Sequence, residues 1–191
     1  MPEELFIAFK VYGEAQTAGS KRSWVPLHPK LRLPYWSGSK TCRSCRGESS
    51  TERCDDCTPR IIVNTVDDNP KSNEWKKHVH ATARKAMKAA GLEVIDKDTE
   101  GTTLLTPLRV VARFYKVRPD THYRTGKFSD LLKDNAPAFP TPKPDVLKLM
   151  RALEDGMTGA VYKDDCQIVT QTPGKFFGKE NRVDVEIYIL K

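Results

Sequence analysis

Acids and cations are concentrated between residues 143 and 169, in the segment KPDVLKLMRALEDGMTGAVYKDDCQIV. Its carboxylates are Asp145, Glu154, Asp155, Asp164 and Asp165, and its cations are Lys143, Lys148, Arg151 and Lys163. Magnesium takes oxygen ligands, commonly one or two carboxylates together with water and phosphate. In a nuclease the ion stabilises the attacking and leaving oxygens of an in-line displacement, and nearby cations hold the phosphates. The segment therefore has the composition of a magnesium-dependent nuclease site.

A helix must position most of these acids. We expect it to begin at Asp145, a good N-cap residue after Pro144, and to end at Gly159. Its apolar residues fall on one face within about 100°; they are Val146, Leu149, Met150, Leu153 and Met157.

The pair Asp164-Asp165 precedes a strand expected from Cys166 to about Thr170, with Cys166 a buried strand residue and not a ligand. If helix and strand pack antiparallel, the pair lies near the C-terminal end of the helix. Asp145 then needs a bend or shift of the chain to come close.

Each acid also has an interpretation that needs no metal. Asp145 can be an N-cap without any further role, and Asp164-Asp165 can form an ordinary turn. Glu154 and Asp155 can be solvated helix residues. No one of these signals establishes a metal site by itself.

The combination resembles the RusA family of Holliday junction resolvases, as found in phages and prophages. The residues that carry the resemblance are Lys143-Pro144-Asp145, Asp155, Gly159 and Tyr162-Lys163-Asp164-Asp165-Cys166-Gln167-Ile168-Val169. Gly19-Ser20-Lys21-Arg22, and Asp67 to Lys71 followed by Trp75, resemble phage members more weakly. The resemblance implies a small dimeric α+β fold, magnesium dependence and cleavage of branched DNA.

The resemblance also implies roles for single residues. The family's first metal aspartate falls on Asp145, and the aspartate after the turn falls on Asp165, with Asp164 beside it. Asp155 matches the acid in the second half of the helix. Arg151 replaces the family's basic residue, usually Lys; because Arg is a poor proton donor, a phosphate clamp suits it better.

One position departs from the family pattern. Leu147 stands where the family has its second metal aspartate, and Glu154 occupies a position that is usually apolar. The two residues differ by only about 20° around a helix and lie roughly 10 Å apart along it. We hypothesise that Glu154 supplies the lost carboxylate from further along the helix, nearer Asp165. The alternative is that Leu147 marks a weakened copy that still binds DNA.

The cysteines form a separate pattern, CxxC-x8-CxxC, made of Cys42, Cys45, Cys54 and Cys57. Two such pairs of thiolates make a closed tetrahedral zinc site; four free cysteines in a loop are the alternative. A structural zinc orders a segment that cannot build its own core. We therefore expect an inserted zinc knuckle at residues 40–59, without catalysis. Its basic residues suit either a DNA arm or a solvated surface.

The other elements predict an α+β fold. We expect strands at 5–13, 61–63, 107–116 and 182–190, and a helix from Ser72 or Asn73 to about Ala90. Together with the acidic helix, this order predicts a small mixed β-sheet packed with two main helices. We expect residues 1–191 to form a single RusA-like nuclease domain that carries the module at 40–59.

Residues 117–143 are largely polar and predict a long surface loop, a length typical of functional loops. Cations and the aromatic residues Tyr123 and Phe128 are interleaved between residues 116 and 130. Cations contact phosphates, and aromatic rings stack on unpaired bases. We predict DNA contacts from Arg118, Arg124, Lys127, Lys143, Lys148 and Lys163. A solvated loop is the alternative.

The net charge of +7 favours a polyanionic partner, and nucleic acid is the common one. No apolar run approaches the roughly 18 residues of a membrane span. The first residues, MPEELFIAFKVYG, lack the layout of a signal peptide. We expect a cytoplasmic protein, inside a bacterial host if a phage encodes it, and no membrane partner.

These observations predict a magnesium-dependent, structure-specific endodeoxyribonuclease. Acting as a homodimer, it would resolve Holliday or other branched DNA junctions by paired nicks. One alternative is a catalytically weakened, zinc-bearing protein that binds junction DNA. Another is a zinc-ribbon regulator that binds duplex DNA.

Overall fold

The computed structural model describes residues 2–191 except 20, 30, 38–42, 47, 53, 56–59, 68 and 96–105. The chain forms two compact units, Met1–Ala18 with Asn69–Lys191, and Gly19–Asp68. The second unit contains the range of the predicted module and is wider than it. The division into one nuclease domain with a module at 40–59 stays a prediction.

A mixed four-stranded sheet is the centre of the first unit, with the order β1-β9-β7-β8. The strands are β1 (Glu3–Tyr12), β7 (Leu108–Val117), β8 (Ile168–Gly178) and β9 (Arg182–Leu190). β9 pairs antiparallel with β1 and β7, whereas β7 and β8 are parallel. A parallel pair needs a long crossover connection, and the chain from β7 to β8 contains the acidic helix. The predicted strands at 5–13, 107–116 and 182–190 are confirmed within two residues.

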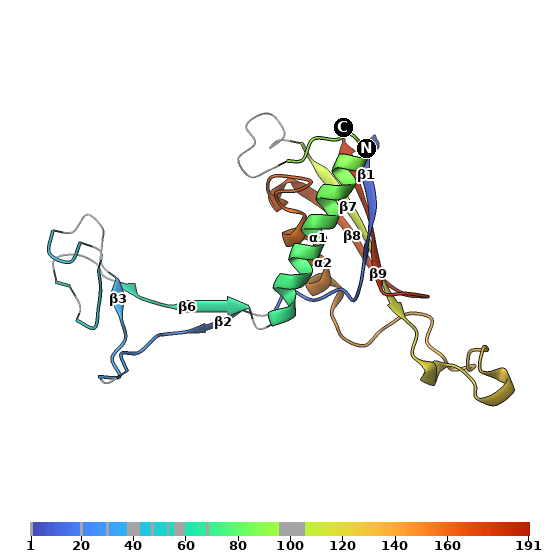
Figure 1. Cartoon of the computed structure of the whole chain (residues 1–191), viewed down its shortest axis with the longest axis horizontal. Coiled ribbons are helices and arrows are strands. Elements are labelled where there is room, and N and C mark those ends of the chain that lie inside the picture. Colours follow the sequence, from blue (N-terminus) through green and yellow to red (C-terminus); the bar gives the residue numbers. More distant parts are fainter. Residues whose placement is uncertain are drawn as a thin grey trace. The chain divides into compact units, whose positions relative to one another are not determined.

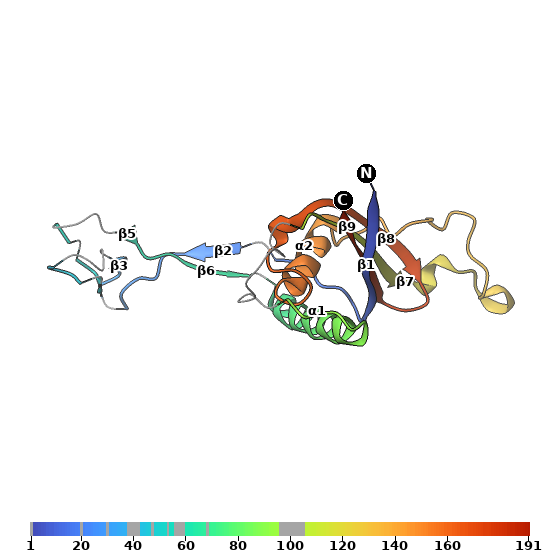
Figure 2. The same ribbon diagram turned by 90° about the horizontal axis from the view of Figure 1, so that it is seen from above.

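Two helices, α1 (Pro70–Ala89) and α2 (Val146–Met157), cover one face of this sheet, as Figures 1 and 2 show. Their apolar faces form the core with the buried residues of β1, β7 and β9; from the helices it takes Val79, Ala83, Met87, Leu149 and Leu153. The predicted α+β fold with a mixed sheet and two main helices is confirmed.

α1 and α2 are in close contact at Gly156. A Cβ atom added there would lie 2.8 Å from both Cβ and Cγ1 of Val79 and 3.1 Å from the backbone oxygen of Lys76. One residue away, the Lys76 ammonium forms an ion pair with Asp155 at 2.8 Å. The glycine therefore sets the depth of α2 in the core and, with it, the placement of the acids in its last turn.

The start of α1 differs from the expectation. The N-cap is Asn69, whose side chain accepts a hydrogen bond from the backbone of Lys71 at 3.1 Å, instead of Ser72 or Asn73. Pro70 occupies the first turn, where its missing N–H is not needed and its fixed φ favours the helix. Asn69-Pro70 is thus the beginning of the helix.

Residues 118–142 form a projecting arm that extends beyond the end of β7, as the gold segment of Figures 1 and 2 shows. It contains the short helices η2 (Asp120–His122) and η3 (Gly126–Phe128). Backbone hydrogen bonds close it on itself, from Arg124 to Leu131 at 2.8 Å and from Lys133 to His122 at 2.9 Å. The predicted loop is therefore an ordered arm.

The second unit contains two small sheets. β2 (Lys21–Trp24) pairs antiparallel with β6 (Asn64–Asp67), and β4 (Ser49–Ser50), β3 (Trp36–Ser37) and β5 (Arg60–Ile61) form the other. No strand spans the expected range 61–63, because β5 ends at Ile61 and β6 begins at Asn64. Cys45 and Cys54 are half-buried here, whereas Cys42 and Cys57 lie outside the described residues.

None of the helices in the described part of the chain is both long and apolar enough to cross a membrane.

Candidate active site

Glu154 lies in the last turn of α2 and is buried, with 7% of its surface exposed. Within the described residues its Oε1 atom has no hydrogen-bond partner. Burial first, and then the nearby carboxylates of Asp165 and Asp155, raise the pKa of Glu154 to about 7, against an opposing effect of Arg151. A buried carboxylate oxygen without a donor is costly, and a cation can satisfy it.

The turn after α2 is hydrogen-bonded to the backbone of Glu154. Tyr162 is fully buried and donates its hydroxyl to the backbone oxygen of Glu154 at 3.0 Å. The same oxygen accepts the backbone N–H of Thr158 at 3.0 Å. Gly159 reverses the chain with a φ of +72°, a conformation that favours glycine. The segment 158–162 therefore folds back over the helix end.

Asp164 and Asp165 have different environments. The Asp164 side chain accepts the backbone N–H of Cys166 at 2.9 Å and, with Gln167, completes a capping box of the short helix η4 (Asp165–Gln167). This hydrogen bonding lowers the pKa of Asp164. Asp165 is exposed, and its charge contributes to the raised pKa of Glu154. The turn interpretation thus describes Asp164, whereas the Asp165 side chain is exposed to solvent.

η4 also corrects the expected start of the strand. β8 begins at Ile168, and Cys166 is exposed in η4 instead of buried in a strand. Asp164 is the reason, because its side chain bonds to the backbone N–H of Cys166 and holds the residue in the turn.

Asp145 stands at the N-cap position of α2, but its side chain makes no capping hydrogen bond. It lies about 13 Å from Glu154 along the helix axis, at 1.5 Å per residue. Leu147 is 67% exposed in the first turn. Leu147 and Glu154 thus differ in environment although their positions around the helix are similar.

In the described part of the chain no three His, Cys, Asp or Glu side chains converge to hold a metal ion, so Asp145, Glu154 and Asp165 form no such cluster.

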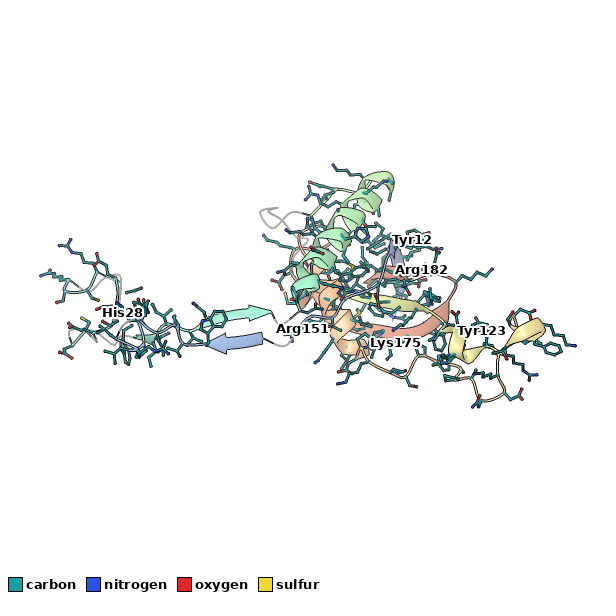
Figure 3. All side chains as sticks on the ribbon, turned by 60° about the horizontal axis from the view of Figure 1, so that its bottom comes forward. Tyr12, His28, Tyr123, Arg151, Lys175 and Arg182 are labelled. Carbon is teal, nitrogen blue, oxygen red and sulfur yellow. The ribbon has the colours of Figure 1, made fainter. Side chains whose placement is uncertain are left out.

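The predicted cations of the segment lie at its surface. Lys143, Lys148 and Arg151 are exposed, and Lys163 is half-buried. Figure 3 labels Arg151 on α2, Lys175 on the sheet and Tyr123 on the arm. The Arg151 guanidinium is near enough to Glu154 to oppose the rise of its pKa.

The predicted cations of the arm contact the protein itself. Arg118 donates to the backbone oxygen of Pro137 at 2.8 Å and stacks over the Phe177 ring at 3.9 Å. Arg124 forms an ion pair with Asp134 at 2.7 Å. Lys127 lies 5.2 Å from the ring of its neighbour Phe128 near the exposed tip. Arg118 and Arg124 therefore brace the arm, and Lys127 is the more accessible cation.

Lys175 was not singled out from the sequence, yet it fixes the entry to α2. Its ammonium donates to the backbone oxygens of Pro142 and Pro144, each at 3.0 Å. It thereby ties β8 to the residues that precede Asp145. Its partners are backbone carbonyls, which have no sequence signature, so no pattern could have identified it.

The Lys175→Met variant is expected to lose about 1 kcal/mol of stability, because two charge-assisted hydrogen bonds disappear. Chemical denaturation measures the effect. Lys179→Met, at an exposed position after β8, is the matched control. Equal behaviour of the two variants would contradict the positioning role.

The acids near the end of α2 fit a magnesium ion. Glu154 offers a buried oxygen that has no hydrogen-bond partner among the described residues, and Asp165 offers an exposed carboxylate close to it. Magnesium commonly takes one or two carboxylates and fills its other positions with water and phosphate. Two carboxylates with room for solvent are therefore sufficient. Asp155 is committed to its ion pair with Lys76.

A family model described as "Endodeoxyribonuclease RusA" matches residues 60–188, more than half of the chain. The matched range contains α1, β7, α2 and β8 and leaves out residues 40–59. A similar curated protein is "Uncharacterized protein YqaN" of Bacillus subtilis (strain 168), 29% identical over 86 residues. The match covers 45% of this chain and 60% of that protein, so the chain spans less than two thirds of its length.

Proposed function

Because the chain belongs to the RusA family of endodeoxyribonucleases, we propose that it is a magnesium-dependent nuclease that cuts branched DNA. Its substrate class is the four-way junction, and a homodimer places paired nicks in opposed strands. The observation that carries this proposal is the buried, unpartnered carboxylate oxygen of Glu154 beside Asp165.

In this proposal Glu154 and Asp165 hold the magnesium ion. When bound, the ion supplies positive charge to the attacking and leaving oxygens and lowers the pKa of a water nucleophile. Asp164 keeps Asp165 in place through the capping box of η4. Asp155 fixes the last turn of α2 through Lys76. Asp145 is a third acid, at the opposite end of the helix.

The cations hold the DNA. Arg151 has the planar, bidentate geometry that suits a phosphate clamp, and it lies close to Glu154. Lys148 and Lys163 counter further phosphate charge, and Lys143 does so before the helix. On the arm, Lys127 near the exposed tip contacts the DNA, with Phe128 available to stack on an unpaired base.

A single assay tests the function. The purified chain is mixed with a synthetic four-way junction or the matching duplex, in Mg²⁺ or in EDTA. Paired nicks that require both the junction and Mg²⁺ are expected. Asp165→Asn is expected to bind the junction without cutting it, and Asp145→Asn shows whether the acid at the start of α2 is also needed.

Other results of the assay would identify another function. Binding without nicks by the unmodified chain indicates a weakened, junction-binding protein, and equal binding to junction and duplex indicates a duplex-binding regulator. An Asp165→Asn variant that still cuts would reject the assigned metal site.

The four cysteines are proposed to hold one structural zinc ion. Two of them, Cys45 and Cys54, are half-buried in the second unit, and a closed site of four thiolates stabilises a small segment.

The purified chain is therefore expected to contain about one zinc per chain, and Cys54→Ser should lose most of it, since a site of three thiolates binds more weakly. Elemental analysis measures the content. Cys166→Ser, outside the two pairs, is the control and should keep its zinc. A chain that is free of zinc after purification without chelators would reject the site.

A further inference from the structure

A cavity of about 120 Å³ lies beside the start of α2. Its lining includes the aromatic residues Phe114, Tyr115, His122 and Phe177, and also Pro144 and Leu149. These residues come from β7, β8, the arm and the segment at the start of α2. Pro144 directly precedes Asp145, so the cavity lies beside the N-cap of α2.

The cavity has positive charge at its edge. Lys116, Lys143 and Lys175 line it, and Glu14 is the one acidic residue among the described residues that line it. Lys116 and Lys143 are exposed, whereas Lys175 is held at the cavity by its bonds to Pro142 and Pro144. This balance favours a ligand that carries an anionic group outside the apolar space.

The aromatic wall is held in place before any ligand binds. His122 meets the Phe177 ring edge-on, with centroids 5.5 Å apart and an angle of 89°. The Arg118 guanidinium lies over the same Phe177 ring at 3.9 Å. In addition, Nδ1 of His122 is buried without a hydrogen-bond partner in the described part of the chain. Such an atom is costly to leave unpaired, and a ligand with a polar edge can satisfy it.

The volume limits the ligand to one small ring. An apolar cavity of about 150 Å³ holds a benzene molecule, so a cavity of about 120 Å³ that is open to solvent accepts a single six-membered ring. A planar ring with a polar edge, joined to an external anion, is the chemistry of a nucleotide. Aromatic walls favour such a ring because bases stack on them.

We propose that this cavity binds one unpaired nucleobase of the DNA substrate, while Lys116 and Lys143 hold the adjoining phosphate. The inference rests on the proposed function, since it assumes a branched DNA whose bases can leave the duplex near the crossover. A free nucleotide has the same chemistry, and the experiment must separate the two sources.

The Ala15→Leu variant is the test, because Ala15 lines the cavity and is only partly buried, so that a larger side chain fills the space. Ala81→Leu, at an exposed position on α1, adds the same volume elsewhere. Thermal unfolding of both variants checks that they are folded. Binding is measured in EDTA with junctions that carry one abasic site, moved step by step through the crossover.

For the unmodified chain, one abasic position is expected to weaken binding about tenfold, the value of one stacked base. Ala15→Leu should bind the intact junction about tenfold more weakly and should not respond to the abasic position. Ala81→Leu should behave as the unmodified chain. An abasic profile of Ala15→Leu equal to that of the unmodified chain would overturn the proposal.

Photochemical crosslinking gives a second readout that is independent of affinity. A 5-iodouracil placed at the sensitive position should crosslink to the peptides that contain His122 or Phe177, and Ala15→Leu should lose this product. Crosslinks that map only outside the cavity would overturn the inference, as would tight binding of free thymidine monophosphate that blocks the junction.

An unmodified chain that cuts junctions but shows no sensitive position refutes the base pocket alone. One that neither binds nor cuts branched DNA refutes the proposed function as well.

Discussion

The Glu154→Gln variant is expected to cut a four-way junction at least about a hundredfold more slowly than the unmodified chain in Mg²⁺. The glutamine has almost the same shape, but its neutral oxygen is a much weaker ligand for a divalent cation. Single-turnover cleavage at saturating junction measures the chemical step without the contribution of DNA binding. Glu74→Gln, on the exposed surface of α1, is the matched control and should cut normally.

The same variant is expected to be more stable than the unmodified chain in EDTA, by roughly 1–2 kcal/mol. Glu154 is 7% exposed, and one of its oxygens lacks a partner among the described residues. Without the metal, the folded state therefore contains a buried charge that glutamine removes. Denaturant unfolding at pH 8 measures the difference.

Magnesium should raise the melting temperature of the unmodified chain and leave that of Glu154→Gln nearly unchanged, because a ligand stabilises only the state that binds it. A loss of stability in EDTA, or full cleavage by the variant, would show that Glu154 is an ordinary buried residue. A loss of cleavage in Mg²⁺ together with a gain of stability in EDTA is the result expected of a residue that binds the metal.

The Gly156→Ala variant is expected to lower the free energy of unfolding by about 1–2 kcal/mol. Helix propensity alone predicts the opposite sign, a gain of about 1 kcal/mol for alanine over glycine. The added methyl group would, however, lie 2.8 Å from Val79 and 3.1 Å from the backbone oxygen of Lys76. Overpacking of this kind costs about 1–3 kcal/mol, and the upper end applies because a backbone atom and a stiff β-branched side chain cannot move away easily.

Denaturant unfolding measures whether Gly156→Ala lowers or raises the free energy of unfolding. Because α1 must move away from the last turn of α2, the Lys76–Asp155 ion pair and the placement of Glu154 should change too. Cleavage by Gly156→Ala is therefore expected to fall about tenfold even under conditions where the variant is fully folded. An increase in stability would mean that the two helices are not in close contact at this point.

Residues 143–169 carried most of what could be predicted. The apolar period of α2 and the Asp145 N-cap position are local patterns, and the structure places both as expected. The acid pair differs, because the short helix η4 separates it from β8. The family match over residues 60–188 confirms the resemblance drawn from this segment. By contrast, the roles of the individual acids stay predictions, since they depend on a metal and on DNA.

Local sequence patterns did not predict the role of a side chain where its hydrogen-bond partner is a backbone group. Lys175 fixes the entry to α2 through two carbonyls, and Asp164 holds the turn through a backbone N–H. Every residue has these groups, so the sequence does not indicate which of them is used. The same applies to Asn69, where the cap lay earlier than expected because a proline can begin a helix.

The family, the two helices, the mixed sheet and the set of acids could be predicted from the sequence, because periodicity and spacing act within single elements. The fold was needed to show that Glu154 is buried, that the Asp164 side chain caps η4, and that Asp145, Glu154 and Asp165 form no three-residue metal cluster among the described residues. The physical reason is that burial and electrostatic fields depend on which elements meet in space. That pairing is set by contacts between residues far apart in the chain.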